Sequence, residues 1–235
     1  MGSLSARRFA THLGVALLTV ATLALSARYP RAETFVQAAT IGFGYLSLTL
    51  IGATLLVGPL ALRRRPRNPV NLSLRRDLGI WAGLTGLAHV VLGLQVHFGG
   101  DPIRYFVQPI VREAYFAVGE EERYFEVVAG WAPLTDLFGL ANWLGLAATI
   151  VLLLLLVLSN DRALRALRGP RWKALQRLNY LLVLLVLIHT VAYQRVVERE
   201  VGFALGVAGL TGVVLAGQLI GVSLHRRARR THPSA

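Results

Sequence analysis

Six long apolar runs dominate the sequence and constrain its fold more than any other feature. An α-helix rises about 1.5 Å per residue, so about 20 apolar residues are needed to cross a bilayer core. Inside lipid every backbone amide must be paired, and these runs are too long and continuous for strands. We therefore predict an all-α, polytopic membrane bundle of about six transmembrane helices in a single domain. The predicted spans lie near residues 9–27, 35–62, 74–98, 134–158, 174–194 and 201–224.

Basic residues are distributed unevenly between these runs. The chain has a net charge of +13, although 54% of its residues are hydrophobic. Of its 25 Lys and Arg residues, eighteen fall on one side of the predicted membrane, in segments 7–8, 63–76, 162–177 and 226–230. Cytoplasmic loops are the basic ones, so we predict a multi-pass membrane protein with both termini in the cytoplasm. The clusters are short and separated, which indicates membrane lipid and not nucleic acid as the partner.

Two segments allow a second interpretation. Arg7-Arg8, the apolar stretch after them and Ala24-Leu25-Ser26-Ala27 also fit a cleavable signal peptide, whose removal would leave five spans. The longest connection, residues 99–133, is acidic and rich in aromatic residues. We expect one or two amphipathic helices lying at the outer interface of the membrane. The alternative for this connection is a docking lid or an entrance for a small solute.

Two histidines fall inside predicted spans, where an ionisable side chain is costly and needs a reason. His89 follows Arg76 by 13 residues, and His189 follows Lys173 by 16 residues. These separations correspond to about 20 Å and 24 Å of helix rise, so both imidazoles are expected at similar depth in the outer half of the bilayer. Two neutral imidazoles on facing helices can supply both axial ligands of a haem iron. The alternative is that both are hydrogen-bonded packing residues.

Small residues share a helix face with His89. Ala82, Gly86, His89 and Gly93 are spaced by four, three and four residues. Such a stripe lets a porphyrin approach the backbone, and it equally lets another helix approach. The corresponding face around His189 carries larger, mostly apolar residues, which are Leu182, Leu185, Val186 and Tyr193.

The other histidines are expected outside a haem site. We place His97 at the outer interface, as a solvated residue or a spare ligand. His12 lies near the inner edge of the first span, where its side chain is expected to reach toward the membrane surface. His225 and His232 belong to the basic tail, which suits anionic lipid.

Two motifs lead to His89 and His189. Arg75-Arg76-Asp77-Leu78-Gly79-Ile80 precedes the first, and Trp172-Lys173-Ala174-Leu175-Gln176-Arg177-Leu178-Asn179-Tyr180 precedes the second. In these segments the chain resembles the ferric-reductase-like transmembrane family, within which it is most similar to the haem-binding membrane subunits of bacterial methionine sulfoxide reductase systems. The resemblance covers all spans in topology, but specific motifs only in the third and fifth. It implies a helical bundle that holds haem b, with His89 and His189 as its axial pair.

The chain departs from this family at the position of a second haem. Many members hold that haem nearer the cytoplasm, with histidines where this chain has Arg75 and Gln176. Neither side chain is a suitable ligand, so we expect one haem. A flavin or quinone near Arg75, Arg76, Gln176 and Arg177 would then bring electrons to the cytoplasmic half, since guanidinium groups suit phosphate. The alternative is that these arginines only follow the positive-inside bias.

Together these features predict a membrane cytochrome b-type electron-transfer protein with no catalytic residue of its own. The absence of cysteine excludes disulfides, thiolate ligands and iron–sulfur clusters. No Gly-rich dinucleotide fingerprint follows a strand–helix pattern, so electrons must come from a separate redox partner protein. We expect a subunit of a ferric-reductase-like or sulfoxide-reductase-like oxidoreductase that delivers electrons to a partner or to ferric iron. The alternatives are a haem-free transporter and a structural or assembly subunit of a membrane complex.

Overall fold

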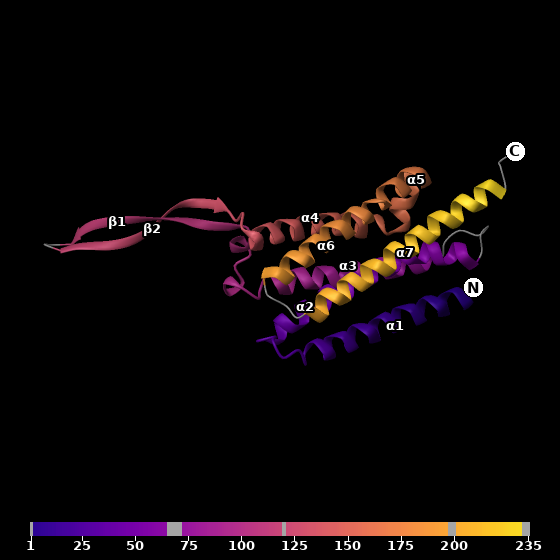
Figure 1. Ribbon diagram of the computed structural model, residues 1–235, viewed down its shortest axis with the longest axis horizontal. Helices are drawn as coiled ribbons and strands as arrows, with labels where there is room; N and C mark the ends of the chain where they lie inside the picture. The colour runs from indigo at the N-terminus through magenta and orange to yellow at the C-terminus, as the bar shows by residue number, and fades with distance from the viewer. Residues whose placement is uncertain (1, 65–71, 119–120, 197–200, 232–235) are drawn as a thin grey trace.

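The chain forms a helical bundle with one projecting two-stranded arm (Figure 1). The computed structural model describes residues 2–64, 72–118, 121–196 and 201–231. Its helices are α1 (Gly2–Ser26), α2 (Phe35–Arg64), α3 (Leu72–Gly93), α4 (Leu137–Leu158), α5 (Asp161–Gln176), α6 (Leu178–Val196) and α7 (Val201–Thr231). Short 3-10 turns η1 (Phe98–Gly100) and η2 (Ile103–Tyr105) lead into strands β1 (Val107–Val118) and β2 (Glu121–Pro133). Much of the basic segment 63–76, with Arg199 and His232, lies outside the described residues.

Five of the described helical segments are long and apolar enough to cross a membrane. They are Ala6–Ser26, Phe35–Ala61, Leu137–Leu158, Pro170–Val196 and Val201–Arg226. The predicted span 74–98 is not among these five. Its helix α3 ends at Gly93, and Arg75, Arg76 and Asp77 near its start lower its hydropathy.

The connection 99–133 is where the helix prediction is wrong. The expected amphipathic helices are absent from its described residues, and β1 instead pairs antiparallel with β2, from Val107 opposite Pro133 to Val118 opposite Glu121. The all-α prediction therefore holds for the bundle but not for the arm. Both strands are rich in β-branched and aromatic residues, which favour extended structure. Pro109 would in addition interrupt a helix.

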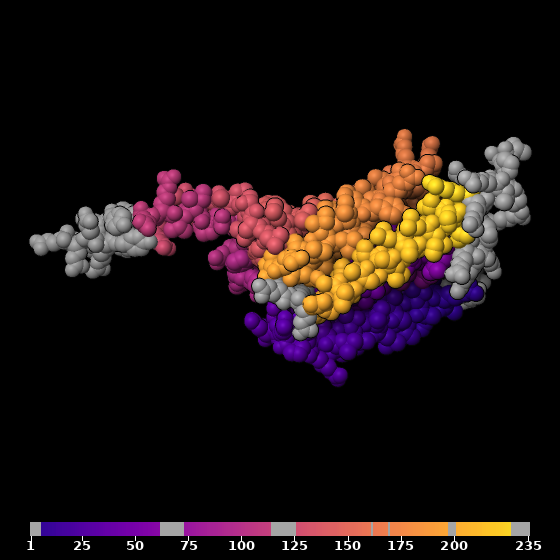
Figure 2. Space-filling view, viewed as in Figure 1, coloured from indigo at the N-terminus to yellow at the C-terminus, as the bar shows by residue number. Residues whose placement is uncertain are grey.

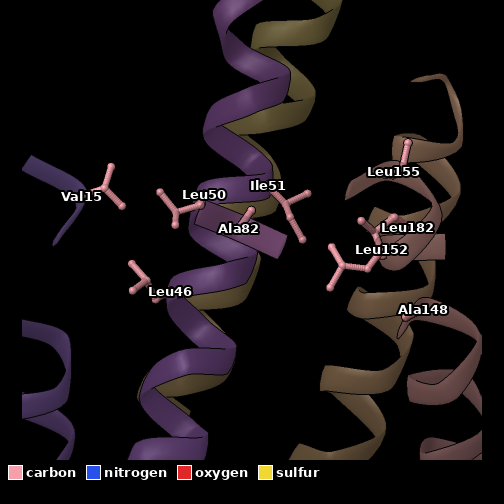
Figure 3. Packing of buried hydrophobic residues seen from close by; sticks show 9 residues of the cluster. All are labelled: Val15, Leu46, Leu50, Ile51, Ala82, Ala148, Leu152, Leu155 and Leu182. Atoms are coloured by element: carbon pink, nitrogen blue, oxygen red, sulfur yellow. The ribbon is translucent and has the colours of Figure 1, made fainter. Parts of the chain in front are cut away.

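The helices associate mainly as two pairs. α2 packs most extensively on α3, and α4 on α6, while α1 and α7 lie against α2. A core of small and aliphatic side chains runs from α1 through α2 and α3 to α4 and α6; its members are Val15, Leu46, Leu50, Ile51, Ala82, Ala148, Leu152, Leu155 and Leu182 (Figure 3). Because lipid tails are as apolar as leucine, close packing and not exclusion from water holds such a core together.

A buried carboxylate fastens α1 to α3. Asp77 is 1% exposed, and it accepts hydrogen bonds from Nε and Nη2 of Arg8 at 3.1 and 2.9 Å. Nδ1 of His12 accepts from the indole of Trp81 at 3.0 Å. The ring of His12 therefore joins the contact between α1 and α3, and the expectation that it reaches toward the membrane surface stays a prediction.

Basic residues gather at the end of the bundle that lies opposite the arm. The start of α1, the end of α7 and the basic helix α5 lie at one end, and the arm leaves the other end (Figure 1). This arrangement agrees with the distribution of basic residues that the sequence predicts on one side of the membrane.

Candidate functional site

A cavity of about 290 Å³ lies between α2, α3, α4 and α6. His89 from α3 and His189 from α6 both line it. Their ring centroids are 6.3 Å apart, and the ring planes are inclined by 85°. The fold thus brings together the two histidines that the sequence predicts as a pair.

The separation of the two rings suits a single metal ion between them. A bond from an imidazole nitrogen to a metal such as zinc or haem iron is about 2 Å long, so the centroids of two axial imidazoles lie about 6 Å apart. The rest of the cavity is mostly apolar, with Leu152, Leu182 and Val186 in its wall. Among the described residues, no group of three or more His, Cys, Asp or Glu could hold a metal ion. The residues present therefore fit a haem iron with two histidine ligands.

Each imidazole is held by a backbone carbonyl of a neighbouring helix. Nδ1 of His89 lies 2.8 Å from the carbonyl oxygen of Thr40 on α2. Nδ1 of His189 lies 2.8 Å from the carbonyl oxygen of Ala141 on α4. A carbonyl oxygen only accepts, so each Nδ1 carries the proton and donates it. This tautomer leaves the lone pair on Nε2, as metal ligation by histidine requires.

A glycine makes room for each ring one turn after its carbonyl partner. A Cβ at Gly44 would lie 2.8 Å from Nδ1 of His89, and one at Gly145 would lie 2.9 Å from Cε1 and Nδ1 of His189. The two imidazoles are therefore supported in the same way, by residues four apart on a facing helix. These supporting positions could not be predicted, because neither supporting helix carries a histidine and any residue type can supply a backbone carbonyl.

Two of the small residues predicted on the face of His89, Gly86 and Gly93, lie in the wall of the cavity. A Cβ at Gly86 would lie 2.7 Å from Leu152 of α4 and 2.9 Å from Ser47 of α2. Gly86 thus mainly permits close helix packing.

Polar side chains lie at the end of the cavity that is nearest the arm. Tyr193 donates to Asn142, whose Nδ2 donates to the carbonyl of Tyr105 at 3.1 Å. The Tyr105 hydroxyl donates to the carbonyl of Gly93 at 2.8 Å and accepts from the amide of His97 at the same distance. Burial raises the pKa of Tyr105, while backbone hydrogen bonds to this hydroxyl oppose that rise. His97 is exposed and also lines this end of the cavity, and its place at an outer membrane interface stays a prediction.

A second, smaller pocket of about 70 Å³ lies at the basic end. Arg75, Arg76 and Gln176 line it, as predicted, together with Trp172. In the described part of the chain, Nε2 of Gln176 is a buried donor with no hydrogen-bond partner. Arg177, the fourth predicted residue, is the exposed C-cap of α5.

Comparison with known proteins gives one family and a group of relatives. The model of the family described as ferric reductase like transmembrane component matches residues 39–188, which begin just before Thr40 and end just before His189. Among curated proteins, the chain is similar to the protein-methionine-sulfoxide reductase heme-binding subunit MsrQ of several bacteria. The match with Klebsiella pneumoniae is 26% identical over 168 residues, covering 71% of this chain and 69% of the relative.

Two further relatives carry the same name. The Rhodospirillum rubrum protein is 32% identical over 109 residues, covering 46% of this chain and 50% of the relative. The Yersinia pseudotuberculosis protein is 27% identical over 146 residues, covering 62% of this chain and 58% of the relative. The chain therefore spans between about half and two thirds of the length of the relatives it matches.

Proposed function

Because the chain belongs to the ferric-reductase-like transmembrane family, we propose that it is a membrane cytochrome b that transfers electrons through one haem b. The observation that carries this proposal is the pair of imidazoles at 6.3 Å, each with its Nδ1 tethered to a carbonyl. The relatives named above are called heme-binding subunits, which supports the same cofactor. When bound, haem supplies a one-electron redox centre.

The protein's own groups would hold and tune that centre. His89 and His189 would act as the axial ligands through Nε2. The carbonyls of Thr40 and Ala141 keep Nδ1 protonated, which fixes each ring and raises the basicity of Nε2. The apolar wall lowers the local dielectric and keeps water from the metal, and both effects influence a reduction potential.

We further propose that a flavin or quinone binds at the small basic pocket. Arg75 and Arg76 suit a phosphate or another anionic group, and Gln176 offers a donor that has no hydrogen-bond partner within the described residues. A volume of about 70 Å³ holds only part of such a ring system, so α5 would have to move to admit it. Gln176 stands where many members of the family have a histidine that binds a second haem, and this difference favours a single haem in this chain.

The proposed setting is a bacterial inner membrane, with the basic end of the bundle in the cytoplasm and the arm outside. In this proposal α3 also crosses the membrane, with its charged start at the cytoplasmic surface. The electron acceptor on the outer side would be a methionine sulfoxide reductase subunit, since the relatives are named as subunits of that reductase. Ferric iron is the second candidate acceptor, from the family description.

A visible spectrum of detergent-purified protein tests the proposal first. We expect a reduced-minus-oxidised b-type α-band with about one haem per chain. His89→Ala and His189→Ala should each abolish haem retention, and the matched variant His97→Ala should keep it. No haem band in cells supplied with haem would contradict the proposal and leave transport or assembly as the function. Equal haem loss in all three variants would contradict the ligand assignment.

A further inference from the structure

The arm formed by β1 and β2 stands clear of the helices. It leaves the end of the bundle opposite both termini and continues roughly along the direction of the helices, and its described base is a narrow extension of the molecular surface (Figures 1 and 2). A strand of 12 residues is about 40 Å long, so the arm reaches well beyond a bilayer surface. A hairpin of two strands is only marginally stable in water. A partner that covers one face would stabilise it.

One face of the arm combines apolar and acidic side chains. Residues directly opposite one another in an antiparallel pair share a face, and alternate residues along a strand do so too. The register shifts between Ile110 and Val111, so that Ala129 is left out of the pairing and Val128 lies opposite Val111. One face, called here the docking face, therefore carries three cross-strand pairs, Pro109 with Trp131, Val111 with Val128, and Glu113 with Glu126.

On the docking face Val111, Val128 and Trp131 are 46%, 54% and 58% exposed. On the opposite face Ile110 and Val127 are 44% and 42% exposed. The docking face is set apart by Trp131 and by its two opposed glutamates. Apolar groups this exposed in the aqueous phase are typical of an interaction surface.

The charge of the arm indicates what kind of partner it binds. Residues 107–133 include five glutamates and two arginines, whereas the whole chain has a net charge of +13. An acidic arm is repelled by anionic lipid headgroups and by the same arm of a second copy. It attracts a protein with a basic surface. The arm also points away from the membrane plane, and this direction favours a soluble protein over lipid as the partner.

The base of the arm lies over the mouth of the histidine cavity. The amide of Leu134 donates to the carbonyl of Phe106 at 2.8 Å, which closes the base of the hairpin. Phe106 lines the cavity next to Tyr105, and its ring lies 5.0 Å from that of Trp143 on α4. A protein held by the arm is therefore brought to the outer end of the cavity.

We propose that the docking face binds a soluble partner protein, through a partner surface that is basic and has an apolar centre. The arm would hold this partner over the outer mouth of the histidine cavity. The identity of the partner as the electron acceptor rests on the proposed function. The binding of a partner to the docking face does not rest on the proposed function, because it depends only on the side chains of the arm.

Binding can be measured without any electron transfer. The full chain in nanodiscs is immobilised, and the probe is a purified partner subunit of a bacterial protein-methionine-sulfoxide reductase, the enzyme after which the relatives are named. Glu126→Lys and Val128→Lys, both on the docking face, should each weaken binding at least tenfold at low salt. The matched control is Gln108→Lys, which places the same residue at an exposed position of the opposite face. Its affinity should stay within twofold of wild type, and added salt should weaken wild-type binding.

The outcomes separate the docking proposal from the proposed function. Three outcomes would overturn the docking proposal. These are equal affinities in all variants, equal weakening by all three lysine substitutions, and no binding by the wild type. Self-association of the wild-type chain that the docking-face lysines abolish would also overturn it, in favour of a second copy. If the wild-type chain binds the probe but carries no haem, the docking proposal is upheld and the proposed cytochrome function is overturned.

Discussion

Replacing Gly44 by alanine probes the support of one imidazole without touching the imidazole itself. The new Cβ would lie 2.8 Å from Nδ1 of His89, whereas ordinary contacts begin at 3.4 Å, so the ring must retreat by about 0.6 Å. Nδ1 already lies 2.8 Å from the Thr40 carbonyl, and a retreat of that size takes the hydrogen bond out of its usual range. Loss of such a partner typically lowers metal affinity about 10- to 100-fold, or about 1.4 to 2.7 kcal/mol.

Haem titration into the purified apo-protein measures this effect. Gly44→Ala should bind haem about 10- to 100-fold more weakly than wild type, with a shifted reduction potential for the fraction that binds. Gly58→Ala is the matched control, because it lies on the same helix and its new Cβ meets no atom within 4 Å. If Gly44→Ala and Gly58→Ala bind haem equally and with equal potentials, then the carbonyl tether has no part in holding the cofactor.

Three further predictions concern the surroundings of the cavity. Gln176→Ala should leave haem content unchanged in the pyridine haemochrome assay, because the proposed haem site between His89 and His189 is separate from the pocket that Gln176 lines; an emptied site would show that the one-haem scheme is wrong. Arg8→Ala removes the bidentate partner of buried Asp77 and should lower stability by about 1–3 kcal/mol in thermal melts, a range set by the half-exposed arginine; an unchanged melting temperature would refute the role of this ion pair. Tyr105→Phe should cost about 1 kcal/mol at neutral pH. Since burial raises the Tyr105 pKa, the wild-type advantage should persist below about pH 10 and disappear as pH rises through the raised pKa, a loss that melts across pH would reveal.

Much of the bundle could be predicted because lipid imposes strict requirements. Long apolar runs must be helical, and five of the predicted spans correspond to helices that are apolar enough to cross a membrane. Counting residues from basic helix ends also predicted that His89 and His189 lie at matching depth, and the fold places their rings 6.3 Å apart. Haem ligation by this pair stays a prediction.

The features that sequence reasoning missed depend on groups without a local signature. Thr40 and Ala141 contribute only backbone carbonyls, and their partners lie 49 and 48 residues away in the chain. The ion pair between Arg8 and Asp77 spans 69 residues and likewise has no short-range pattern. The arm was missed because aromatic residues between glutamates fit an amphipathic helix as well as a strand, and the β-branched content of the strands decides between them.

The two-pair arrangement of the helices gives the cofactor a part in assembly. Each pair, α2 with α3 and α4 with α6, contains one imidazole together with the carbonyl that orients it. A haem bound by both imidazoles would therefore take one oriented ligand from each pair. Haem bound by both halves would join them as a crosslink, and its binding free energy would add to the stability of the whole bundle. Haem insertion would then be the maturation step that locks the two halves of the chain into one rigid body.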